Sequence, residues 1–402
     1  MSRVSERLDE LRRAGLQRRL RTVDGAQGPR VSLGGAEVLL LCSNNYLGLA
    51  DAAPVRRAAA AAAERFGAGA GASRLISGTM ELHRELERRL AEFHRSEAAL
   101  AFGSGYLANT GTIAALAGRG EVVFSDELNH ASIIDGCRLS RAETFVYRHR
   151  DIEHLAWALA RARGRGALIV TDAVFSMDGD VAPLAELAAL TRDSGCMLMV
   201  DEAHATGALG PGGRGAVAEA GLEDEVDVIV GTLGKSLGSY GAYVCAGAEI
   251  RELLVNAART FVFSTALPPP AIGAALAALE LTSTRPELAG LLRRNAGVLR
   301  GELATCGLDT GSSSTQVMPV IVGDPRSAVA LCERCLERGV FAQAIRPPTV
   351  PAGTSRLRLS VMATHHPAEL RSAARLIAAA CRELGIFPAA TPATPARVRP
   401  AA

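Results

Sequence analysis

The stretch VDVIVGTLGKSLGSYG, residues 226–241, decides the fold and indicates the chemistry of this chain. It begins as an apolar strand and opens into a glycine-rich turn that contains Lys235. The chain has 44 Lys and Arg residues, and because Lys235 is the single lysine, the other 43 are arginines. Arginine can replace lysine where only charge or hydrogen bonding is needed, but a guanidinium does not become a nucleophilic amine. The lone lysine therefore predicts Schiff-base chemistry, against the alternative of a solvated loop cation.

Length and composition limit the class of protein. With 402 residues, 48% of them hydrophobic and 21% charged, the chain is expected to be a soluble globular protein of two or three subdomains. A formal net charge of +2 and only 4% aromatic residues give no indication of a nucleic-acid partner. The Arg-rich N-terminus carries Glu6, Asp9 and Glu10, which argues against a transit peptide. No apolar run reaches the roughly 20 residues of a spanning helix, so we expect no membrane association and a cytoplasmic location.

The eight cysteines are expected to be reduced core thiols, since most lie in apolar segments and no secretory signal precedes them. Cys332 and Cys335 form a C-x-x-C motif, but no second pair or His cluster follows at zinc spacing. We interpret them as two positions of one helix and expect no metal site.

Strands and helices alternate from the N-terminal third to residue 245, which predicts a largely parallel, doubly wound sheet. The expected domains are an N-terminal helix and arm (1–50), a large domain (51–284), a small αβ domain (285–387) and a disordered tail (388–402). The first helix is expected over residues 3–21. The strands expected up to Lys235 are residues 38–41, one starting near 99, 122–126, 167–172, 196–200 and 226–230.

Several polar side chains are expected just past the ends of these strands, where open α/β sheets bind ligands. Asp201 and His204 follow one strand in DEAHATG, and an acid at a buried strand end usually has a cationic partner. His130 follows another, although a satisfied surface histidine explains it equally well. Gly105 and Tyr106 begin a helix, whose free N–H groups would suit a phosphate.

Glycines cluster in two further places. Those around Lys235, at positions 231, 234, 238 and 241, are expected to leave room for a flat cofactor. The glycine-dense loop of residues 67–78 indicates either close approach of the backbone to a ligand or another chain, or a plain linker.

A nucleoside-triphosphate hydrolase is the tempting alternative, because GKS and DEAH both occur. A phosphate-binding loop needs a glycine five residues before the Gly of GK, and counting back from Gly234 reaches Ile229. The order is also reversed, since the acidic strand end precedes GKS. The constellation instead provides what pyridoxal phosphate needs: an amine for its aldehyde, a carboxylate for its pyridine nitrogen and a helix end for its phosphate.

The sequence resembles the α-oxoamine synthases, from about residue 3 to about 387 and without large gaps. These are pyridoxal-phosphate enzymes of fold type I that condense an amino acid with an acyl thioester and release carbon dioxide. The resemblance implies a large domain with a mostly parallel seven-stranded sheet sandwiched by helices, plus a smaller C-terminal αβ domain. The matching stretches are SNNYLGL (43–49), GASRLISGTMELHRELE (71–87), FGSGYLAN (102–109), NHASIIDG (129–136), TDAVFSMDGD (171–180), VDEAHATGALGPGGRG (200–215) and GTLGKSLGSYG (231–241).

The resemblance implies a role for each matching position. Lys235 would carry the cofactor as a Schiff base and later remove the Cα proton of the bound amino acid. Asp201 would pair with the pyridine nitrogen, His204 would hydrogen-bond the phenolic oxygen, and His130 would stack on the ring. The remaining implied residues are Gly105, Tyr106, Ser176 and Thr232 at the cofactor, Ser264 and Thr265 at the phosphate of the partner subunit in a homodimer with shared active sites, and Arg18, Thr349 and Arg358 at the substrates.

Two stretches narrow the expected substrates. IRPPTVPAGTSRLRLS (345–360) and VDEAHATG are most similar to the members that join L-alanine to a pimeloyl thioester, while NHASIIDG does not discriminate. Arg358 would then clamp the alanine carboxylate, and the acyl group would arrive on coenzyme A or on a carrier protein. The alternative is another α-oxoamine synthase that uses a different amino acid or acyl chain. A cofactor-free binding protein on the same scaffold is a third hypothesis, against which Lys235, Asp201 and His204 argue.

Overall fold

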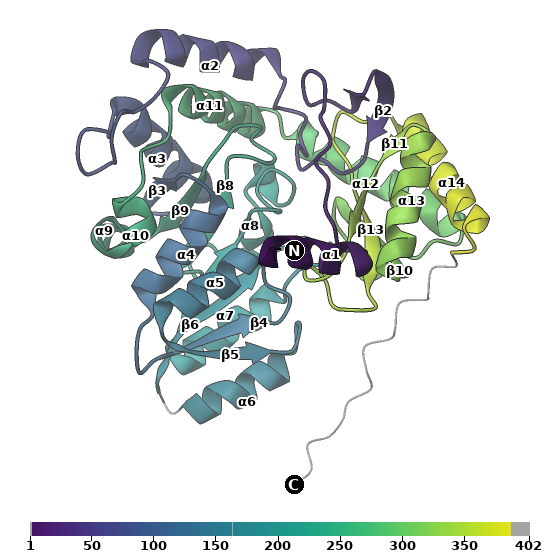
Figure 1. Cartoon of the computed structure of the whole chain (residues 1–402). Helices are drawn as coiled ribbons and strands as arrows, with labels where there is room; N and C mark the ends of the chain where they lie inside the picture. Colours follow the sequence, from purple (N-terminus) through teal and green to yellow (C-terminus); the bar gives the residue numbers. More distant parts are fainter. Residues whose placement is uncertain (1, 163, 387–402) are drawn as a thin grey trace. The chain divides into compact units, whose positions relative to one another are not determined.

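The computed structural model describes residues 2–162 and 164–386, and the expected tail of residues 388–402 lies outside this range. The chain divides into two compact units (Figure 1). The larger unit is made of residues 44–176 and 180–292. The smaller unit is made of residues 1–43, 177–179 and 293–402, as far as these are described.

A seven-stranded sheet forms the centre of the larger unit, as the resemblance to the α-oxoamine synthases implies. The strand order is β3-β9-β8-β7-β6-β4-β5, with β9 antiparallel to both neighbours and the remaining pairs parallel. Most residues of the central strands are buried, as expected for a sheet covered on both faces. The strands are β3 (Ala98–Phe102), β4 (Val122–Asp126), β5 (Glu143–Tyr147), β6 (Gly166–Asp172), β7 (Met197–Asp201), β8 (Val228–Thr232) and β9 (Ala242–Ala246).

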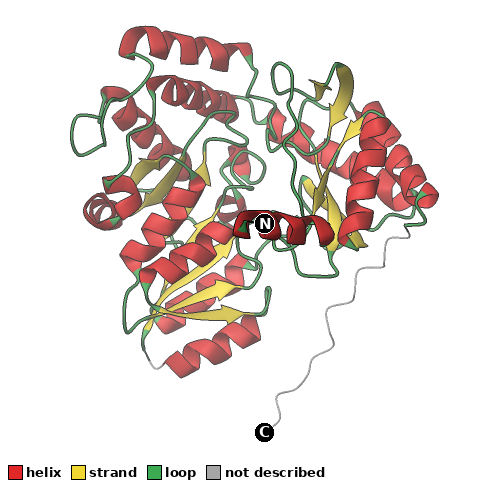
Figure 2. Ribbon diagram, in the orientation of Figure 1, coloured by secondary structure: helices red, strands yellow, loops and turns green. Residues whose placement is uncertain are grey.

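Helices pack on both sides of this sheet (Figure 2). One apolar cluster joins α4, α5, α9 and α10 to the strands, while α3 and α7 contact the strands through residues outside that cluster. The helices are α2 (Ala53–Phe66), α3 (Glu81–His94), α4 (Gly105–Leu116), α5 (Ala131–Ser140), α6 (Ile152–Ala162), α7 (Leu184–Ser194), the 3₁₀ turn η1 (Pro211–Gly213), α8 (Ala216–Ala220), α9 (Ala248–Ala257), α10 (Arg259–Val262) and α11 (Pro269–Thr284).

The smaller unit combines two three-stranded sheets with helices. In one sheet β1 (Arg30–Leu33) pairs antiparallel with β2 (Ala36–Leu40), which pairs parallel with β11 (Val340–Phe341). In the other, β13 (Ser355–Ser360) lies between β10 (Val317–Gly323) and β12 (Gln343–Ile345), antiparallel to both. The helices are α1 (Arg3–Arg13), α13 (Pro325–Glu337) and α14 (Pro367–Glu383), with α12 (Glu287–Thr305) crossing the boundary between the two units.

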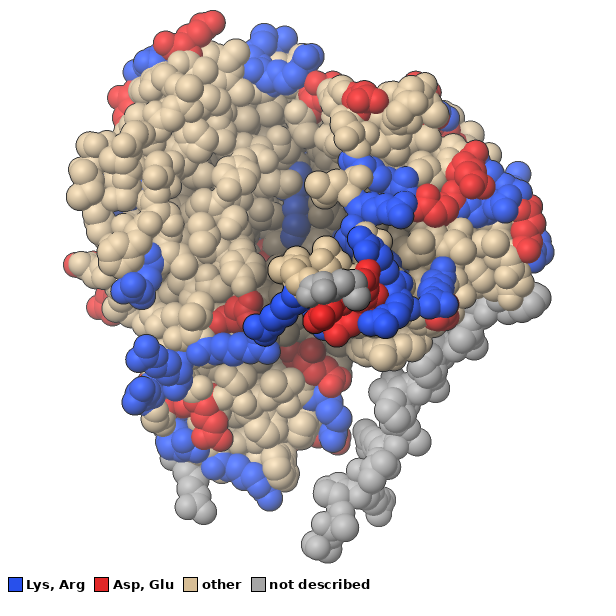
Figure 3. All heavy atoms as spheres, viewed as in Figure 1, with Lys and Arg blue, Asp and Glu red and all other residues tan. Residues whose placement is uncertain are grey.

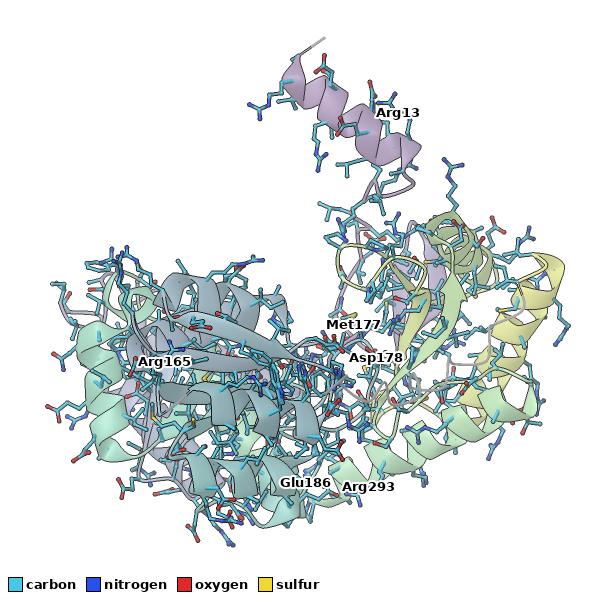
Figure 4. The ribbon with its side chains drawn as sticks, turned by 90° about the horizontal axis from the view of Figure 1, so that it is seen from below. Arg13, Arg165, Met177, Asp178, Glu186 and Arg293 are labelled. Atoms are coloured by element: carbon cyan, nitrogen blue, oxygen red, sulfur yellow. The ribbon has the colours of Figure 1, made fainter. Side chains whose placement is uncertain are left out.

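Helix α1 differs from its prediction, because it ends at Arg13 rather than near residue 21. Gly15 follows with φ +67°, a left-handed conformation that ends a helix readily. The helix has no buried residue, and Figure 4, where Arg13 is labelled, shows it standing off the rest of the smaller unit. Basic and acidic side chains both gather on it (Figure 3).

Strand β5 was not anticipated from the sequence. Its burial pattern is mostly exposed, as befits the edge of the sheet, so it lacks the apolar run that marks its neighbour β4. The C-x-x-C prediction is confirmed, since Cys332 and Cys335 are buried free thiols of α13. Within the described residues, no helix has the length and apolar character to cross a membrane.

Candidate functional site

The candidate site of the larger unit is built at the carboxyl ends of neighbouring parallel strands. Asp201 is the last residue of β7, and Lys235 lies in the turn that follows β8. The register pairs Asp201 with Asp172 of β6 on one side and with Val230 of β8 on the other. Because parallel strands end at the same edge, residues distant in sequence meet there.

Lys235 and His204 are in direct contact. The Lys235 Nζ lies 2.9 Å from His204 Nε2. The other ring nitrogen, Nδ1, lies 2.6 Å from the hydroxyl oxygen of Tyr46, which is fully buried. His204 is only 6% exposed, so its ring is held between these two partners inside the fold.

Asp201 is held by two N–H donors. Asn109 of α4 donates its Nδ2 to Asp201 Oδ2 at 2.6 Å, and the backbone N–H of Ala203 donates to Oδ1 at 2.8 Å. The same Asn109 Nδ2 lies 2.9 Å from the Ser132 hydroxyl oxygen, which lies 2.7 Å from His130 Nδ1. A continuous polar network therefore joins the carboxylate expected at the pyridine nitrogen to the histidine expected at the cofactor ring.

His130 caps the N-terminus of α5, with Nδ1 accepting the N–H of Ser132. The surrounding protein lowers the pKa of His130 by desolvation, the charge of Asp201 opposes this, and that of Lys235 adds to it. Desolvation therefore favours the neutral form of the ring. The residue as a whole is exposed.

Asp172 is a buried acid of this site that the sequence reasoning did not single out. Its Oδ2 accepts the backbone N–H of His130 at 2.7 Å. Burial raises the pKa of Asp172 well above its ordinary value, and the neighbouring charge of Asp201 raises it further. Burial and the neighbouring charge therefore both favour the protonated form of the Asp172 carboxyl group.

Helix α4 begins at Gly105, as expected for a phosphate site. Ser104 caps the helix by accepting the N–H of Leu107 at 3.3 Å, which leaves the N–H groups of Gly105 and Tyr106 at the open end of the first turn. A Cβ at Gly105 would meet nothing within 4 Å, so there is space for a ligand atom beside the backbone. The Tyr106 hydroxyl donates to Asp135 of α5.

The other expected cofactor residues of the larger unit lie at a strand end or on loops. Thr232 ends β8, where its hydroxyl donates to Gly241 O at 3.1 Å and accepts the N–H of Gly234 at 3.2 Å. Ser176 follows β6 and is half-buried. Thr265 forms a β-bridge with Ser73, so the segment of Ser264 and Thr265 lies against the glycine-dense loop of residues 67–78.

The three expected substrate residues lie in the smaller unit. Arg358 is a buried residue of β13, paired in register with Pro319 of β10. Arg18 is exposed in the coil after α1. Burial lowers the pKa of the nearby Arg346 guanidinium, and the positive charge of Arg18 lowers it further. Thr349 is exposed and donates its backbone N–H to Arg346 O at 3.1 Å. Arg18 and Thr349 are therefore brought near the same arginine.

Another arginine of β13, Arg356, helps to hold the short segment 177–179 in the smaller unit. Arg356, which is 4% exposed, donates to Asp178, a residue labelled in Figure 4. Gly179 O accepts the Thr315 hydroxyl at 2.9 Å, and Gly179 has φ +73°. Arg356 also donates to Met177 O at 3.3 Å, so the segment that follows Ser176 in sequence is held on both sides of Asp178.

The prediction for the glycines around Lys235 requires a correction, because three of these glycines make room for protein atoms rather than for a cofactor. A Cβ at Gly231 would lie 2.1 Å from Tyr243 Cζ, and one at Gly238 would lie 2.4 Å from Ala50 N. A Cβ at Gly241 would lie 2.8 Å from Leu267. In the glycine-dense loop, a Cβ at Gly78 would lie 2.1 Å from Ala72 O, so the close approach there is to the loop's own backbone.

The donor set fits pyridoxal phosphate. A lysine amine, a buried carboxylate held by N–H donors, the imidazole of an exposed histidine and an open helix end match its aldehyde, pyridine nitrogen, ring and phosphate. Within residues 2–162 and 164–386, no group of three or more His, Cys, Asp or Glu side chains is placed to hold a metal ion.

Comparison with known proteins places this geometry in a family. Residues 36–377 match the family described as aminotransferase class I and II. The chain belongs to this family. Curated proteins named 8-amino-7-oxononanoate synthase are 55% identical over 387 residues in Geobacter sulfurreducens (95% of this chain, 99% of the relative) and 52% identical over 389 residues in Citrifermentans bemidjiense (96% and 100%).

Solved structures with the same fold are also found. A serine palmitoyltransferase from S. paucimobilis, solved with a PLP–myriocin aldimine, is 34% identical with a TM-score of 0.91, covering 95% of this chain and 98% of that chain. An 8-amino-7-oxononanoate synthase from Francisella tularensis is 27% identical with a TM-score of 0.76, covering 87% and 99%. These findings confirm the predicted fold class and the resemblance to the α-oxoamine synthases.

Sequence reasoning missed the side chains that hydrogen-bond to the predicted site residues and hold them in place. Tyr46 and Asn109 lie inside quoted motifs, SNNYLGL and FGSGYLAN, but were given no role. Asp172 and Ser132 also lie inside such motifs. The available signal was a polar residue within an apolar or helical stretch, which predicts burial with a partner without naming that partner.

Proposed function

We propose that this protein catalyses the decarboxylative condensation of L-alanine with a pimeloyl thioester, giving 8-amino-7-oxononanoate, carbon dioxide and a free thiol, as in biotin biosynthesis. The cofactor is pyridoxal phosphate, as predicted from the sequence. The observation that carries the proposal is the 55% identity over 387 residues to a protein of that name, together with the Lys235–His204 and Asn109–Asp201 contacts.

Each site residue has a task in this reaction. Pyridoxal phosphate, when bound, supplies a carbonyl for amines and an electron sink for the bonds that break at Cα. Lys235 binds the cofactor covalently and moves the Cα proton, a task that only a neutral amine can perform. Asp201, aligned by Asn109, keeps a proton on the pyridine nitrogen. His130 offers its ring as a stacking surface, and the N–H groups of Gly105 and Tyr106 bind phosphate.

The remaining predicted residues complete the proposal. Ser176 and Thr232 contact the cofactor. Arg358 binds the alanine carboxylate through its paired N–H donors, while Arg18 and Thr349 bind the acyl substrate. The buried setting of Arg358 supports a role that needs a fixed guanidinium.

A homodimer with shared active sites belongs to the proposal, with Ser264 and Thr265 reaching the phosphate bound by the partner subunit. Large apolar side chains are exposed around this segment, namely Leu75 (51%), Ile76 (80%) and Phe263 (71%), and the bridge between Ser73 and Thr265 brings their loops together. Contiguous exposed apolar surface is typical of protein interfaces. A cytoplasmic location is proposed from the eight cysteines, all free thiols.

Incubation with alanine and pimeloyl thioesters, followed by mass detection of the amino ketone, tests the proposed reaction. The thioester is offered on coenzyme A and on a carrier protein, and glycine and serine replace alanine in parallel samples. Product from alanine alone supports the proposal. Product only from serine would favour a palmitoyltransferase-like activity, consistent with the TM-score of 0.91 to that enzyme.

The Lys235→Ala variant tests the covalent anchor. Because Lys235 is the only lysine, no other side-chain amine can replace it, and the variant should lose the visible absorbance of the bound cofactor. An Arg-to-Lys change at exposed Arg119, in the turn before β4 of the same unit, is the matched control, since it adds a lysine at the sheet edge opposite to Lys235. An unchanged spectrum in Lys235→Ala would refute the central assignment.

A further inference from the structure

A chain of hydrogen bonds runs inward from Lys235 through His204 to two side chains that the proposed reaction does not use, Tyr46 and Asn44. The Lys235 Nζ lies 2.9 Å from His204 Nε2, and His204 Nδ1 lies 2.6 Å from the Tyr46 hydroxyl oxygen. The Tyr46 hydroxyl in turn donates to Asn44 Oδ1 at 3.1 Å. Tyr46 is 0% and His204 6% exposed, so the middle of this chain is shielded from bulk water, while Lys235 and Asn44 at its ends are half-buried.

The two ends of the chain determine the direction of every bond in it. A lysine ammonium can only donate, and an amide oxygen can only accept. Between them, a neutral imidazole has one donor and one acceptor nitrogen, and a hydroxyl has one hydrogen. Lys235 must therefore donate to His204 Nε2, Nδ1–H must donate to Tyr46, and Tyr46 must donate to Asn44.

We propose that Tyr46 and Asn44 are positioning residues that hold His204 as its Nδ1–H tautomer, so that the Nε2 lone pair faces Lys235 and accepts its proton. The step moves one proton: an N–H bond of the Lys235 ammonium breaks, a bond between that proton and His204 Nε2 forms, and the positive charge passes to the imidazole. Lys235 is left as the neutral amine that attacks a carbonyl. The inference rests on the proposed function and adds the origin of that amine.

The same tautomer accounts for the second task expected of His204. Once Nε2 carries the proton from Lys235, it becomes a donor. A donor is what the implied hydrogen bond to the cofactor's phenolic oxygen requires. The tyrosine need not ionise at any point, since its hydroxyl accepts from Nδ1–H in both states of the ring.

Nitrogen NMR of histidine side chains tests the tautomer in protein without added cofactor. The chain has eight histidines, and His204→Gln identifies the His204 signals. We expect hydrogen on Nδ1 in the parent protein and its transfer to Nε2, or a mixture, in Tyr46→Phe. Asn44→Asp keeps an acceptor at the end of the chain and should retain the parent tautomer.

Tyr243→Phe is the matched control, because Tyr243 is equally buried and its hydroxyl lies 2.8 Å from another histidine, His94 Nε2. It should change the His94 signals and leave those of His204 unaltered. An unchanged His204 tautomer in Tyr46→Phe would overturn the proposal. Should Tyr46→Phe not fold, Asn44→Ala removes the terminal acceptor and provides the same comparison.

The reactivity of Lys235 gives an independent readout. Formaldehyde with a mild reductant methylates amines, and in this chain only Lys235 and the N-terminal amine can react, the latter serving as an internal reference. We expect Tyr46→Phe to slow methylation of Lys235 at pH 7 by about tenfold, the value of one lost hydrogen bond of about 1.4 kcal/mol. His204→Gln should slow it at least as much.

The double variant decides whether Tyr46 acts through His204. If it does, Tyr46→Phe should have no further effect in the His204→Gln background, whereas multiplicative losses would overturn the proposal. Neither readout needs cofactor or substrate. Product formation with an unaltered tautomer in Tyr46→Phe would therefore refute this inference alone, and a shifted tautomer without product would refute the proposed function alone.

Discussion

His149 is held between two carboxylates, and its charge should make the stability of the larger unit depend on pH. Nδ1 lies 2.9 Å from Asp126 Oδ1 and Nε2 lies 2.9 Å from Asp180 Oδ2, while Arg150 contacts Asp180 at 3.2 Å. The two carboxylates are 1% and 3% exposed. Burial works against the charge of His149, but the hydrogen bonds to Asp126 and Asp180 outweigh it and raise the pKa of His149 from 6.5 to about 9.

The sign of the effect follows from this raised pKa. The folded chain keeps a proton that the unfolded chain releases near pH 6.5, so the stabilisation is complete below that pH and is lost as the pH rises through about 9. A shift of this size corresponds to about 2.5 kcal/mol at pH 7 and to nearly nothing at pH 10, since one pKa unit is worth about 1.4 kcal/mol. His149→Gln is neutral at every pH and removes this dependence.

Urea unfolding at pH 6.5 to 10 measures the effect, with Trp157 of α6, the only tryptophan, as a fluorescent reporter of the larger unit. The difference in unfolding free energy between the parent protein and His149→Gln should shrink by about 2.5 kcal/mol from pH 7 to pH 10. His154→Gln is the matched control, because it removes another histidine of the same unit, one whose Nδ1 accepts the backbone N–H of Arg148. A constant difference across this range would refute the reasoning.

Three further predictions concern the site. Asp201→Asn should lower turnover by orders of magnitude while the cofactor still binds, because a neutral amide cannot hold a proton on the pyridine nitrogen; near-normal steady-state rates would contradict this. Arg358→Ala should weaken alanine binding at least tenfold with little effect on the thioester, Arg358→Lys serving as the charge-retaining control, and unaltered alanine titrations would exclude the assignment. Gly231→Ala should destabilise the larger unit by about 1–3 kcal/mol, because the new methyl group overlaps Tyr243, and an unchanged urea midpoint would show that the strand can adjust.

Lys235 and the glycines around it differ in how much of their role a local sequence pattern can predict. Chemistry alone singles out the lysine, because no arginine could do its work. The purpose of a glycine depends on which atoms approach it. At Gly231 those atoms belong to Tyr243, a residue of the adjacent strand β9, and no local feature of the sequence carries that information.

The sequence by itself determined the alternation of strands and helices, and with it the parallel sheet, since burial on both faces produces apolar runs that can be recognised within a few residues. It also placed Asp201, His204 and Lys235 at strand ends. Only the tertiary structure decided which side chains form hydrogen bonds with these residues. Tyr46 and His204 are 158 positions apart and Asn109 and Asp201 are 92 apart, and their contacts follow from the order of strands in the sheet and the packing of α4 upon it. Hydrogen bonds are short-ranged and directional, so such pairs exist only once the whole sheet has formed.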